Sequence, residues 1–564
     1  MRNFALNFFI SLFFCSLVTL FALSRFDYQL TGIDDANIYF VYAKNVASGH
    51  GFVYNVGGER IEGFTSLLWT LICAFTFRFS RHPELILLII NVVLVSLGIA
   101  VALSYLQNDF LGVEKSQQTK IFCSSIFLVL LLTSPRYIVW NTITLMENGL
   151  WSTLLLFTTL FVIKDDSSTR TINFGLIPLS ILLILTRPES MLWVAIFMGI
   201  ILIRKALSKN IITAVRALMP SFVATGVALG LLTLFRLQYF GYPLPNTYYA
   251  KVSPSLSYNL EEGAVYLLKY LTSDPIDFLS VSLVFLFGLQ TLYRIYSKQS
   301  LNDGAAFLSI IAGVGFLMPL ITGGDHFGSF RFYQSIYPIT LLSLFYICDR
   351  ILFKRVIDKA TFFPRTLKLA LVLVSGVGVF LSQAQIGNHL RSEIGTEFQV
   401  AQYERENGEL IQKLFLSLPH PPSIGVIAAG GIKYNYEGEI VDLMGLNNTI
   451  MAHNGGRRAG YKNHAAFEVN TFFKLEPDIV WPREVNESTW QYTYAEVMEG
   501  WENKEGFKGL FSDLDFLNLY TFAKVKHGQI SESPYALVAW FKKDFLTQLR
   551  ESEGFHVVEY AISQ

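Results

Sequence analysis

The chain has 564 residues; 52% of them are hydrophobic, 15% are aromatic and only 16% are charged. This composition argues against a set of soluble domains and is typical of a protein that crosses a membrane many times. Basic and acidic residues number 44 each, so no excess positive charge points to a nucleic-acid partner. The four cysteines all lie in apolar stretches, which indicates neither a disulfide framework nor a metal cluster; they are Cys15, Cys73, Cys123 and Cys348.

Eleven windows along the chain have the length and apolarity that we expect of membrane spans. In chain order they lie near residues 4–24, 85–106, 120–134, 149–163, 172–186, 190–203, 217–235, 277–293, 305–322, 333–349 and 366–383. The first window follows Arg2 and precedes no clear small-residue cleavage site. We therefore interpret it as a retained helix rather than a signal peptide.

A shorter apolar stretch at 65–77 decides the topology. If it lies in the outer interface instead of spanning, the basic loops fall on the cytoplasmic side, as the positive-inside rule requires. If it spans, the rule fails at "IRKALSK" and at "DRILFKRVIDK". The first arrangement is preferred, and it predicts a cytoplasmic N-terminus and an extracytoplasmic C-terminal third.

The sequence changes character after about residue 385, where the long apolar runs stop. Short apolar runs at 423–429, 439–446 and 477–481, with alternating segments at "LYTFAKVKH" and "HVVEYAIS", predict strands separated by helical spacers. We therefore expect a transmembrane domain over 1–384 and a small α/β domain over 385–564. The Gly430-Gly431 pair lacks a complete phosphate-loop pattern and does not indicate a nucleotide site.

In this topology five polar segments, scattered over three hundred residues, fall on the outer face. They are "GIDDANIYFVYAKN", "TLMENGLW", "TRPES", "GYPLPNTYYAK" and "GGDHFGSFRFY". Charged residues at membrane depth are expensive and usually line a cavity. The pattern therefore predicts one outward-facing site built from several loops.

The acidic pair Asp34-Asp35 stands directly after the first span. It is either a solvated loop pair that caps the helix beginning "ANIYFVYAKNVA", or part of a reaction centre. In the second interpretation one carboxylate is a general base that takes a proton from an attacking hydroxyl. Its neighbour would then ligate a metal ion or tune the pKa of the base.

Two further segments carry candidate phosphate ligands. In "TRPES", Arg187 would hold phosphate oxygens, or the segment is a helix corner in which Glu189 caps the next helix. In "GYPLPNTYYAK", Lys251 would bind phosphate as a point charge, beside Asn246 and Tyr248 as substrate contacts. An interfacial aromatic belt explains the tyrosines but not the prolines, the asparagine and the lysine.

The loop "GGDHFGSFR" brings Asp325, His326 and Arg331 together after a glycine pair. These residues are either phosphate and sugar contacts or an ordinary loop, and they are too few for a metal site. Glu147, in "LMENGLW", is a weaker candidate for substrate binding. His453 and His464 match ordinary surface histidines better than ligands.

Together these segments resemble the GT-C membrane glycosyltransferases, and within them the terminal arabinofuranosyltransferases of mycobacterial and corynebacterial cell walls and their Gram-negative relatives. That family has an acidic pair, an aromatic amphipathic helix, a G-x-V-Y-N turn and an E-G-x-T/S segment. These match Asp34-Asp35, Tyr39 to Tyr42, Gly51 to Asn55 and Glu62 to Thr65. "TRPES", "PLPNTYYAK", "GGDHFGSFR" and "VDLMGLNN" follow in the family's order.

The resemblance implies a polytopic helical fold with about eleven transmembrane helices, a juxtamembrane helix at 65–77 and a C-terminal extracytoplasmic α/β domain. It implies an enzyme of the bacterial inner membrane that moves a sugar from a polyprenyl-phosphate-linked donor to an envelope glycan or glycolipid. Asp34 would be the catalytic base of an inverting displacement. Asp35 would assist it, with a divalent cation such as Mg²⁺ or Mn²⁺, while Arg187, Lys251 and Arg331 hold the donor phosphate.

Two other functions stay open. A transporter or flippase of lipid-linked sugars would show inverted repeats and broken helices near the bilayer midplane, and no repeat is evident. A non-catalytic envelope or motility-assembly factor with the same fold would bind glycan without transferring it.

Overall fold

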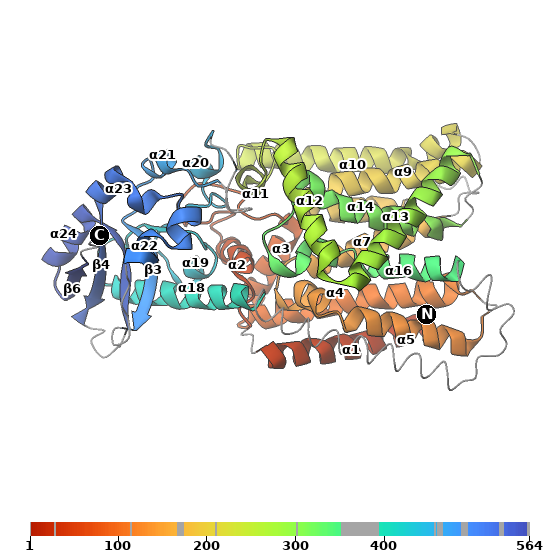
Figure 1. Cartoon of the computed structure of the whole chain (residues 1–564), viewed down its shortest axis with the longest axis horizontal. Coiled ribbons are helices and arrows are strands. Elements are labelled where there is room, and N and C mark those ends of the chain that lie inside the picture. The colour runs from red at the N-terminus through yellow and green to blue at the C-terminus, as the bar shows by residue number, and fades with distance from the viewer. Residues whose placement is uncertain are drawn as a thin grey trace.

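The computed structural model describes residues 2–26, 30–112, 115–165, 174–208, 211–299, 303–350, 394–455, 458, 466–486, 494–528 and 535–560. The molecule is elongated, with a helical part at one end and a smaller part that contains a β-sheet at the other (Figure 1). The N-terminus lies in the helical part, away from the sheet, and the C-terminus lies beside the sheet (Figure 1). The predicted boundary near residue 384 falls outside the described residues.

The helical part runs from α1 to α16. Its α-helices are α1 (Arg2–Phe26), α2 (Asp34–Ala47), α3 (Leu67–Phe79), α4 (Pro83–Tyr105), α5 (Gln117–Leu132), α6 (Pro135–Ile138), α7 (Asn148–Lys164), α8 (Leu176–Thr186), α9 (Ser190–Ser208), α10 (Ile211–Tyr239), α11 (Asn246–Lys251), α12 (Leu256–Ser273), α13 (Pro275–Tyr296), α14 (Phe307–Thr322), α15 (Arg331–Gln334) and α16 (Tyr337–Cys348).

Six helices within the described ranges are long and apolar enough to cross a membrane. They are Asn3–Ser24, Pro83–Phe110, Ser190–Ser208, Ile211–Tyr239, Pro275–Tyr296 and Gly304–Thr322. The other predicted windows coincide with shorter apolar helices, namely α7, α8 and α16, and with a bent pair formed by Gln117–Leu132 and Pro135–Ile143. The window at 366–383 lies outside the described residues.

The window predicted at 120–134 forms α5, and the helix pair to which α5 belongs is bent at its end. The chain bends by 71° after Leu132 and continues as a second helix from Pro135. Proline lacks a backbone N–H and disfavours helical geometry at the residue before it, which accounts for the break at this point.

The predicted juxtamembrane stretch forms α3, a helix of 13 residues. Its N-terminus is capped by Ser66, whose hydroxyl accepts a hydrogen bond from the backbone N–H of Trp69 at 3.1 Å. At about 1.5 Å per residue the helix is about 20 Å long, which is shorter than the hydrocarbon core of a bilayer.

Helix α12 was not predicted. In Figure 1, α12 runs across the direction of α10 and α14 instead of beside them. It buries a single face, formed by Asn259, Gly263, Tyr266 and Tyr270 at helical spacing. Because its other face carries charged residues, it has no long apolar run, which is the signal on which the prediction of spans depends.

The C-terminal part contains one six-stranded sheet in the order β2-β1-β3-β5-β4-β6. Strand β1 pairs in parallel with β2 and β3, and the remaining pairs are antiparallel. The strands are β1 (Ile424–Val426), β2 (Ile440–Asp442), β3 (Ile479–Asn486), β4 (Tyr520–His527), β5 (Tyr535–Lys542) and β6 (Phe555–Glu559). All except β5 were predicted, so the α/β class is confirmed.

The helices of the C-terminal part are α18 (Gly395–Leu414), α19 (Gly431–Asn435), α20 (Thr449–Ala452), α21 (Val469–Phe472), α22 (Tyr494–Met498), α23 (Leu514–Leu519) and α24 (Lys543–Glu551). Helices α18 and α19 pack against α2 and so join the two parts. At this junction the Arg405 guanidinium lies 3.8 Å from the centre of the Tyr434 ring. Both side chains also contact the carboxylate of Glu84 at the start of α4, at 3.2 and 2.9 Å.

Candidate functional site

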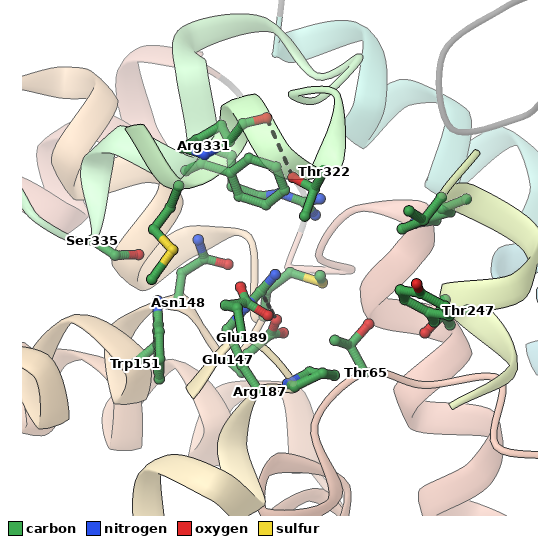
Figure 2. A pocket seen from close by; sticks show the side chains of 18 of the residues that line it. Thr65, Glu147, Asn148, Trp151, Arg187, Glu189, Thr247, Thr322, Arg331 and Ser335 are labelled. Atoms are coloured by element: carbon green, nitrogen blue, oxygen red, sulfur yellow. Dashed lines mark hydrogen bonds and ion pairs between the residues drawn. The ribbon is translucent and has the colours of Figure 1, made fainter. Parts of the chain in front are cut away.

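A pocket of about 470 Å³ lies among the ends of the helices that face the C-terminal part. All five of the predicted polar segments contribute to its lining, as the sequence predicted for a single site. The residues that line the pocket include Asp35, Tyr39, Thr65, Glu147, Asn148, Trp151, Arg187, Glu189, Tyr248, Lys251 and Arg331. Figure 2 shows many of these side chains around the pocket.

The charges that line the pocket are balanced. Three carboxylates and three basic side chains take part, and these are Asp35, Glu147, Glu189, Arg187, Lys251 and Arg331. The Oδ2 atom of Asp35 lies 3.4 Å from Lys251 Nζ and 3.7 Å from Arg331 Nη1. Asp35 therefore faces two basic groups from distant parts of the chain.

Arg331 is held by a carboxylate behind it. Its Nε atom lies 2.7 Å from Oδ2 of the buried Asp325. Although burial works in the opposite direction, the Arg331 charge and the neighbouring His326 hold the pKa of Asp325 well below its usual range. His326 Nδ1 is 3.4 Å from Asp325, and neither residue lines the pocket. Asp325 thus orients Arg331 instead of facing the pocket.

Arg187 lies in the pocket between two carboxylates. Its Nη1 atom donates to Glu147 Oε1 and its Nε atom donates to Glu189 Oε1, both at 2.5 Å. The guanidinium is buried, so these ion pairs are little screened by water. Arg187 therefore fixes the two carboxylates, and a phosphate group at Arg187 would have to compete with both of them.

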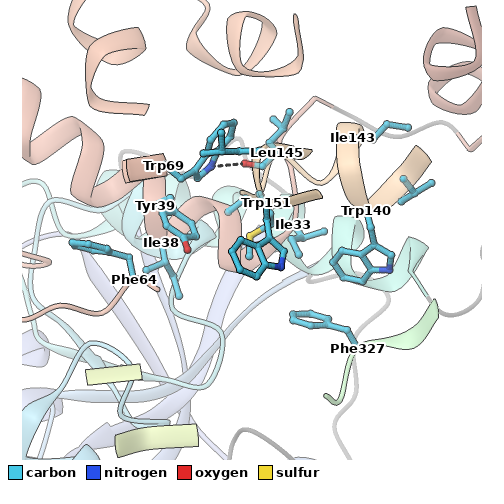
Figure 3. Packing of buried hydrophobic residues seen from close by; sticks show 14 of the residues in the cluster. Ile33, Ile38, Tyr39, Phe64, Trp69, Trp140, Ile143, Leu145, Trp151 and Phe327 are labelled. Atoms are coloured by element: carbon cyan, nitrogen blue, oxygen red, sulfur yellow. Dashed lines mark hydrogen bonds between the residues drawn. The ribbon is translucent and has the colours of Figure 1, made fainter. Parts of the chain in front are cut away.

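The turn that carries Glu147 has an unusual backbone. Leu145 has a φ of 59°, in the left-handed region that residues other than glycine rarely adopt. Two long-range hydrogen bonds hold the turn: Trp69 Nε1 donates to Leu145 O and Asn91 Nδ2 donates to Met146 O, each at 3.2 Å. Figure 3 shows Trp69 bonded to Leu145 within the buried cluster that includes Tyr39 and Trp151. A strained backbone conformation that several contacts hold in place is characteristic of functional turns.

Asp34 does not line the pocket. Its carboxylate is buried and accepts hydrogen bonds from the backbone N–H groups of Gly430, at 3.0 Å, and Gly431, at 2.7 Å. Burial raises the pKa of Asp34 to about 7, although these two amides lower it. Of the acidic pair, the structure brings Asp35 to the pocket and places Asp34 against the C-terminal part.

Asn246 also faces the C-terminal part. Its Nδ2 atom donates to the carbonyl oxygens of Gly445, at 2.7 Å, and Leu446, at 3.0 Å. Leu446 itself lines the pocket, so the C-terminal part supplies a piece of the wall. Tyr248, two residues after Asn246, lines the pocket and is 43% exposed.

Sequence reasoning missed several residues. Trp69 and Asn91 act only through contacts with distant segments, and no local signal marks them. Leu446 lies in the segment "VDLMGLNN", but its place in the pocket wall was not predicted. Glu397, in α18, is another: burial and the nearby carboxylates of Asp35 and Asp34 raise its pKa to about 8. It lies in a polar helix with several other glutamates, so the sequence does not distinguish it from them.

The surroundings of Asp35 do not fit a divalent cation. Its Oδ2 atom already faces Lys251 and Arg331, and the positive charges of these two side chains would repel an incoming metal ion. In the described ranges no group of three or more histidine, cysteine, aspartate or glutamate side chains is placed to hold one. A metal ion at Asp35 stays a prediction of the resemblance, and we assign no step of the chemistry to it.

Part of the pocket wall is apolar and reaches the molecular surface. Met191 and Leu192 of α9 and Ile321 of α14 line the pocket and are 47%, 42% and 49% exposed. The wall thus continues from a charged interior to an apolar exterior.

No protein-family model matches the chain, and no curated protein matches it. Among the solved structures with similar backbones are two membrane enzymes. One is ArnT from Cupriavidus metallidurans bound to undecaprenyl phosphate, with 12% identity and a TM-score of 0.45, over 84% of this chain and 92% of that one. The other is the archaeal oligosaccharyltransferase AglB from Archaeoglobus fulgidus in complex with an inhibitory peptide and a dolichol-phosphate. Its identity is 10% and its TM-score is 0.42, over 91% of this chain and 73% of that one. At TM-scores below 0.5 these similarities do not bear on the function of this chain.

Proposed function

We propose that the chain is a membrane glycosyltransferase that takes a sugar from a polyprenyl-phosphate-linked donor and transfers it to a cell-envelope glycan or glycolipid. The observation that carries the proposal is the composition of the single pocket described above. It combines Lys251 and Arg331 beside Asp35 with an apolar wall that reaches the molecular surface, where we expect lipid. A polyprenyl-phosphoryl sugar has the matching parts, namely an apolar chain, an anionic phosphate and a polar sugar.

Lys251 and Arg331 are the groups best placed for the donor phosphate. Arg187 is held by two carboxylates at 2.5 Å, whereas Lys251 lies 3.4 Å from Asp35. Arg331 is held from behind by Asp325 at 2.7 Å, and its Nη1 atom lies 3.7 Å from Asp35 at the pocket. They would bind the phosphate of the donor and stabilise the negative charge that gathers on it as the sugar leaves. Asp325 would keep the Arg331 guanidinium in position for this role.

Asp35 would be the general base. It removes the proton from the acceptor hydroxyl, whose oxygen attacks the anomeric carbon as the bond from that carbon to the phosphate oxygen breaks. The electron pair of that bond leaves with the polyprenyl phosphate, and a single displacement inverts the anomeric configuration. The resemblance assigns the base to Asp34, but the geometry favours Asp35, because Asp35 lines the pocket.

The site would face outward from a bacterial inner membrane. The basic loops predict that the C-terminal part is extracytoplasmic, and Leu446 of that part lines the pocket. The acceptor glycan would then approach from the aqueous side between the two parts of the molecule, while the donor arrives from the bilayer.

The experiment is a donor panel. Purified protein in detergent is incubated with polyprenyl-phosphoryl sugars and envelope glycan acceptors, and the release of polyprenyl phosphate is measured. Release that depends on both substrates supports a transferase. Movement of a donor across liposome membranes without release would indicate the transporter instead, and binding of glycan without release would indicate the non-catalytic factor.

A further inference from the structure

Two oxygen atoms in the pocket wall are left without a protein partner. Glu147 and Asn148 line the pocket and are only 1% and 2% exposed. Neither Glu147 Oε2 nor Asn148 Oδ1 has a hydrogen-bond partner in the part of the chain that the structure describes. A buried acceptor without a donor is costly, so folded proteins keep few of them away from functional sites.

The direction of these acceptors is fixed by the surrounding structure. The left-handed Leu145 and the hydrogen bonds from Trp69 and Asn91 hold the turn before α7. Arg187 binds the other oxygen of the Glu147 carboxylate at 2.5 Å. Glycine is required at position 149, because a Cβ atom there would meet the carbonyl oxygen of Asn141 at 2.4 Å. These contacts hold the turn that carries the two unpaired acceptors in a fixed position.

The chemistry of the wall selects the ligand group. Glu147 and Asn148 offer acceptors, which bind hydroxyl donors and repel phosphate oxygens. The Glu147 charge is already paired with Arg187, so a hydroxyl suits its second oxygen better than a second cation does. Trp151 lies one helical turn further along α7 and also lines the pocket, where its ring offers an apolar face to sugar C–H groups.

We propose that Glu147 Oε2 and Asn148 Oδ1 bind two hydroxyl groups of the donor's sugar, with Trp151 packed against the sugar ring. This assignment rests on the proposed glycosyltransferase function. It places the phosphate and the sugar of the donor on two different sides of the pocket. In Figure 2, Arg331 lies on the upper side, and Glu147 lies below it with Asn148 and Trp151 nearby. Phosphate binds near Lys251 and Arg331, and the sugar binds at the start of α7.

The test compares two ligands that differ only in the sugar: polyprenyl phosphate and a polyprenyl-phosphoryl sugar that the wild type uses. The variants Asn148→Ala and Glu147→Gln each remove or weaken one acceptor. We expect each to bind the sugar-bearing donor about tenfold more weakly and to bind polyprenyl phosphate as the wild type does. Asn148→Ala should fold normally, because its Oδ1 atom has no protein partner to lose.

The matched control is Thr159→Ala. Thr159 is a buried residue of α7 whose hydroxyl also lacks a partner within the described ranges, but it does not line the pocket. It should leave both affinities unchanged. Unchanged affinity of Asn148→Ala and Glu147→Gln for the sugar-bearing donor would overturn the assignment. So would an equal loss for both ligands in a variant that melts at the wild-type temperature. Failure of the wild type to bind either ligand would instead refute the proposed function, and the sugar subsite with it.

Discussion

The backbone N–H of Gly431 donates a hydrogen bond to Asp34 at 2.7 Å, across 397 residues of sequence. Gly430 has no room for a side chain at this contact, because a Cβ atom would lie 2.0 Å from the carbonyl oxygen of Asp34. The next residue, Asp35, lines the pocket. The C-terminal part is therefore anchored at the first turn of the helix that carries the proposed base, and the two parts of the molecule position the site together.

This contact predicts a pH dependence of stability. Burial raises the pKa of Asp34 from 3.8 to about 7, so the folded protein keeps a proton that the unfolded chain loses between these values. The free energy of unfolding should therefore fall as the pH rises from about 4 to about 7, and this contribution should level off above that. In Asp34→Asn the side chain at this position cannot ionise, so the melting temperature of the variant in detergent should fall less over the same pH range than that of the wild type.

The control for this prediction is Asp515→Asn, which removes an exposed carboxylate of the C-terminal part. It should melt with the same pH dependence as the wild type. If Asp34→Asn also follows the wild-type curve between pH 4 and 8, the Asp34 carboxylate does not titrate in the way that its burial implies.

Removal of Lys251 tests the phosphate site. Its ammonium lies 3.4 Å from Asp35 at the pocket. A charge-assisted hydrogen bond to phosphate contributes about 1.5–3 kcal/mol, so Lys251→Ala should weaken binding of polyprenyl phosphate about 10- to 100-fold. Lys269→Ala removes the same charge from an exposed position on α12 and should have little effect. Equal affinities in the two variants would place the phosphate elsewhere.

The Glu62–Arg236 ion pair should be important for stability. Arg236 of α10 donates from Nε and Nη2 to the two oxygens of Glu62, both at 2.8 Å, and Glu62 is 2% exposed. Loss of one partner of a buried pair typically costs about 3–5 kcal/mol. Glu62→Gln should therefore lower the melting temperature clearly, whereas Glu261→Gln, at an exposed position on α12, should not. Similar melting of both variants would show that the pair contributes little.

Much of the fold could be predicted from the sequence because long apolar windows and alternating strands are local signals. Strand β5 was missed because "YALVAWFK" is a nearly continuous apolar run, and such a run does not distinguish a buried strand from a helix. Helix α12 was missed because charged residues such as Glu261, Glu262 and Lys269 interrupt its apolar residues, so that no long apolar run forms. In both cases the deciding information is the packing partner.

The site was predicted as a set of segments but not atom by atom. Adjacent residues on a helix point about 100° apart, so the sequence cannot say which of Asp34 and Asp35 reaches the pocket. The sequence did not show that the Asn246 amide donates to Gly445 and Leu446, and its contact with substrate stays a prediction. Glu147 was a weak candidate because its role depends on Arg187, 40 residues away.

The most direct test of the account is the rate of polyprenyl phosphate release by Asp35→Asn, measured beside Asp34→Asn with the best donor from the panel. If Asp35 is the base in the pocket, Asp35→Asn should bind the donor but release polyprenyl phosphate about 10²–10⁴ times more slowly than the wild type. Asp34→Asn, with its side chain outside the pocket, should keep more activity. Release by Asp35→Asn at the wild-type rate would contradict the account.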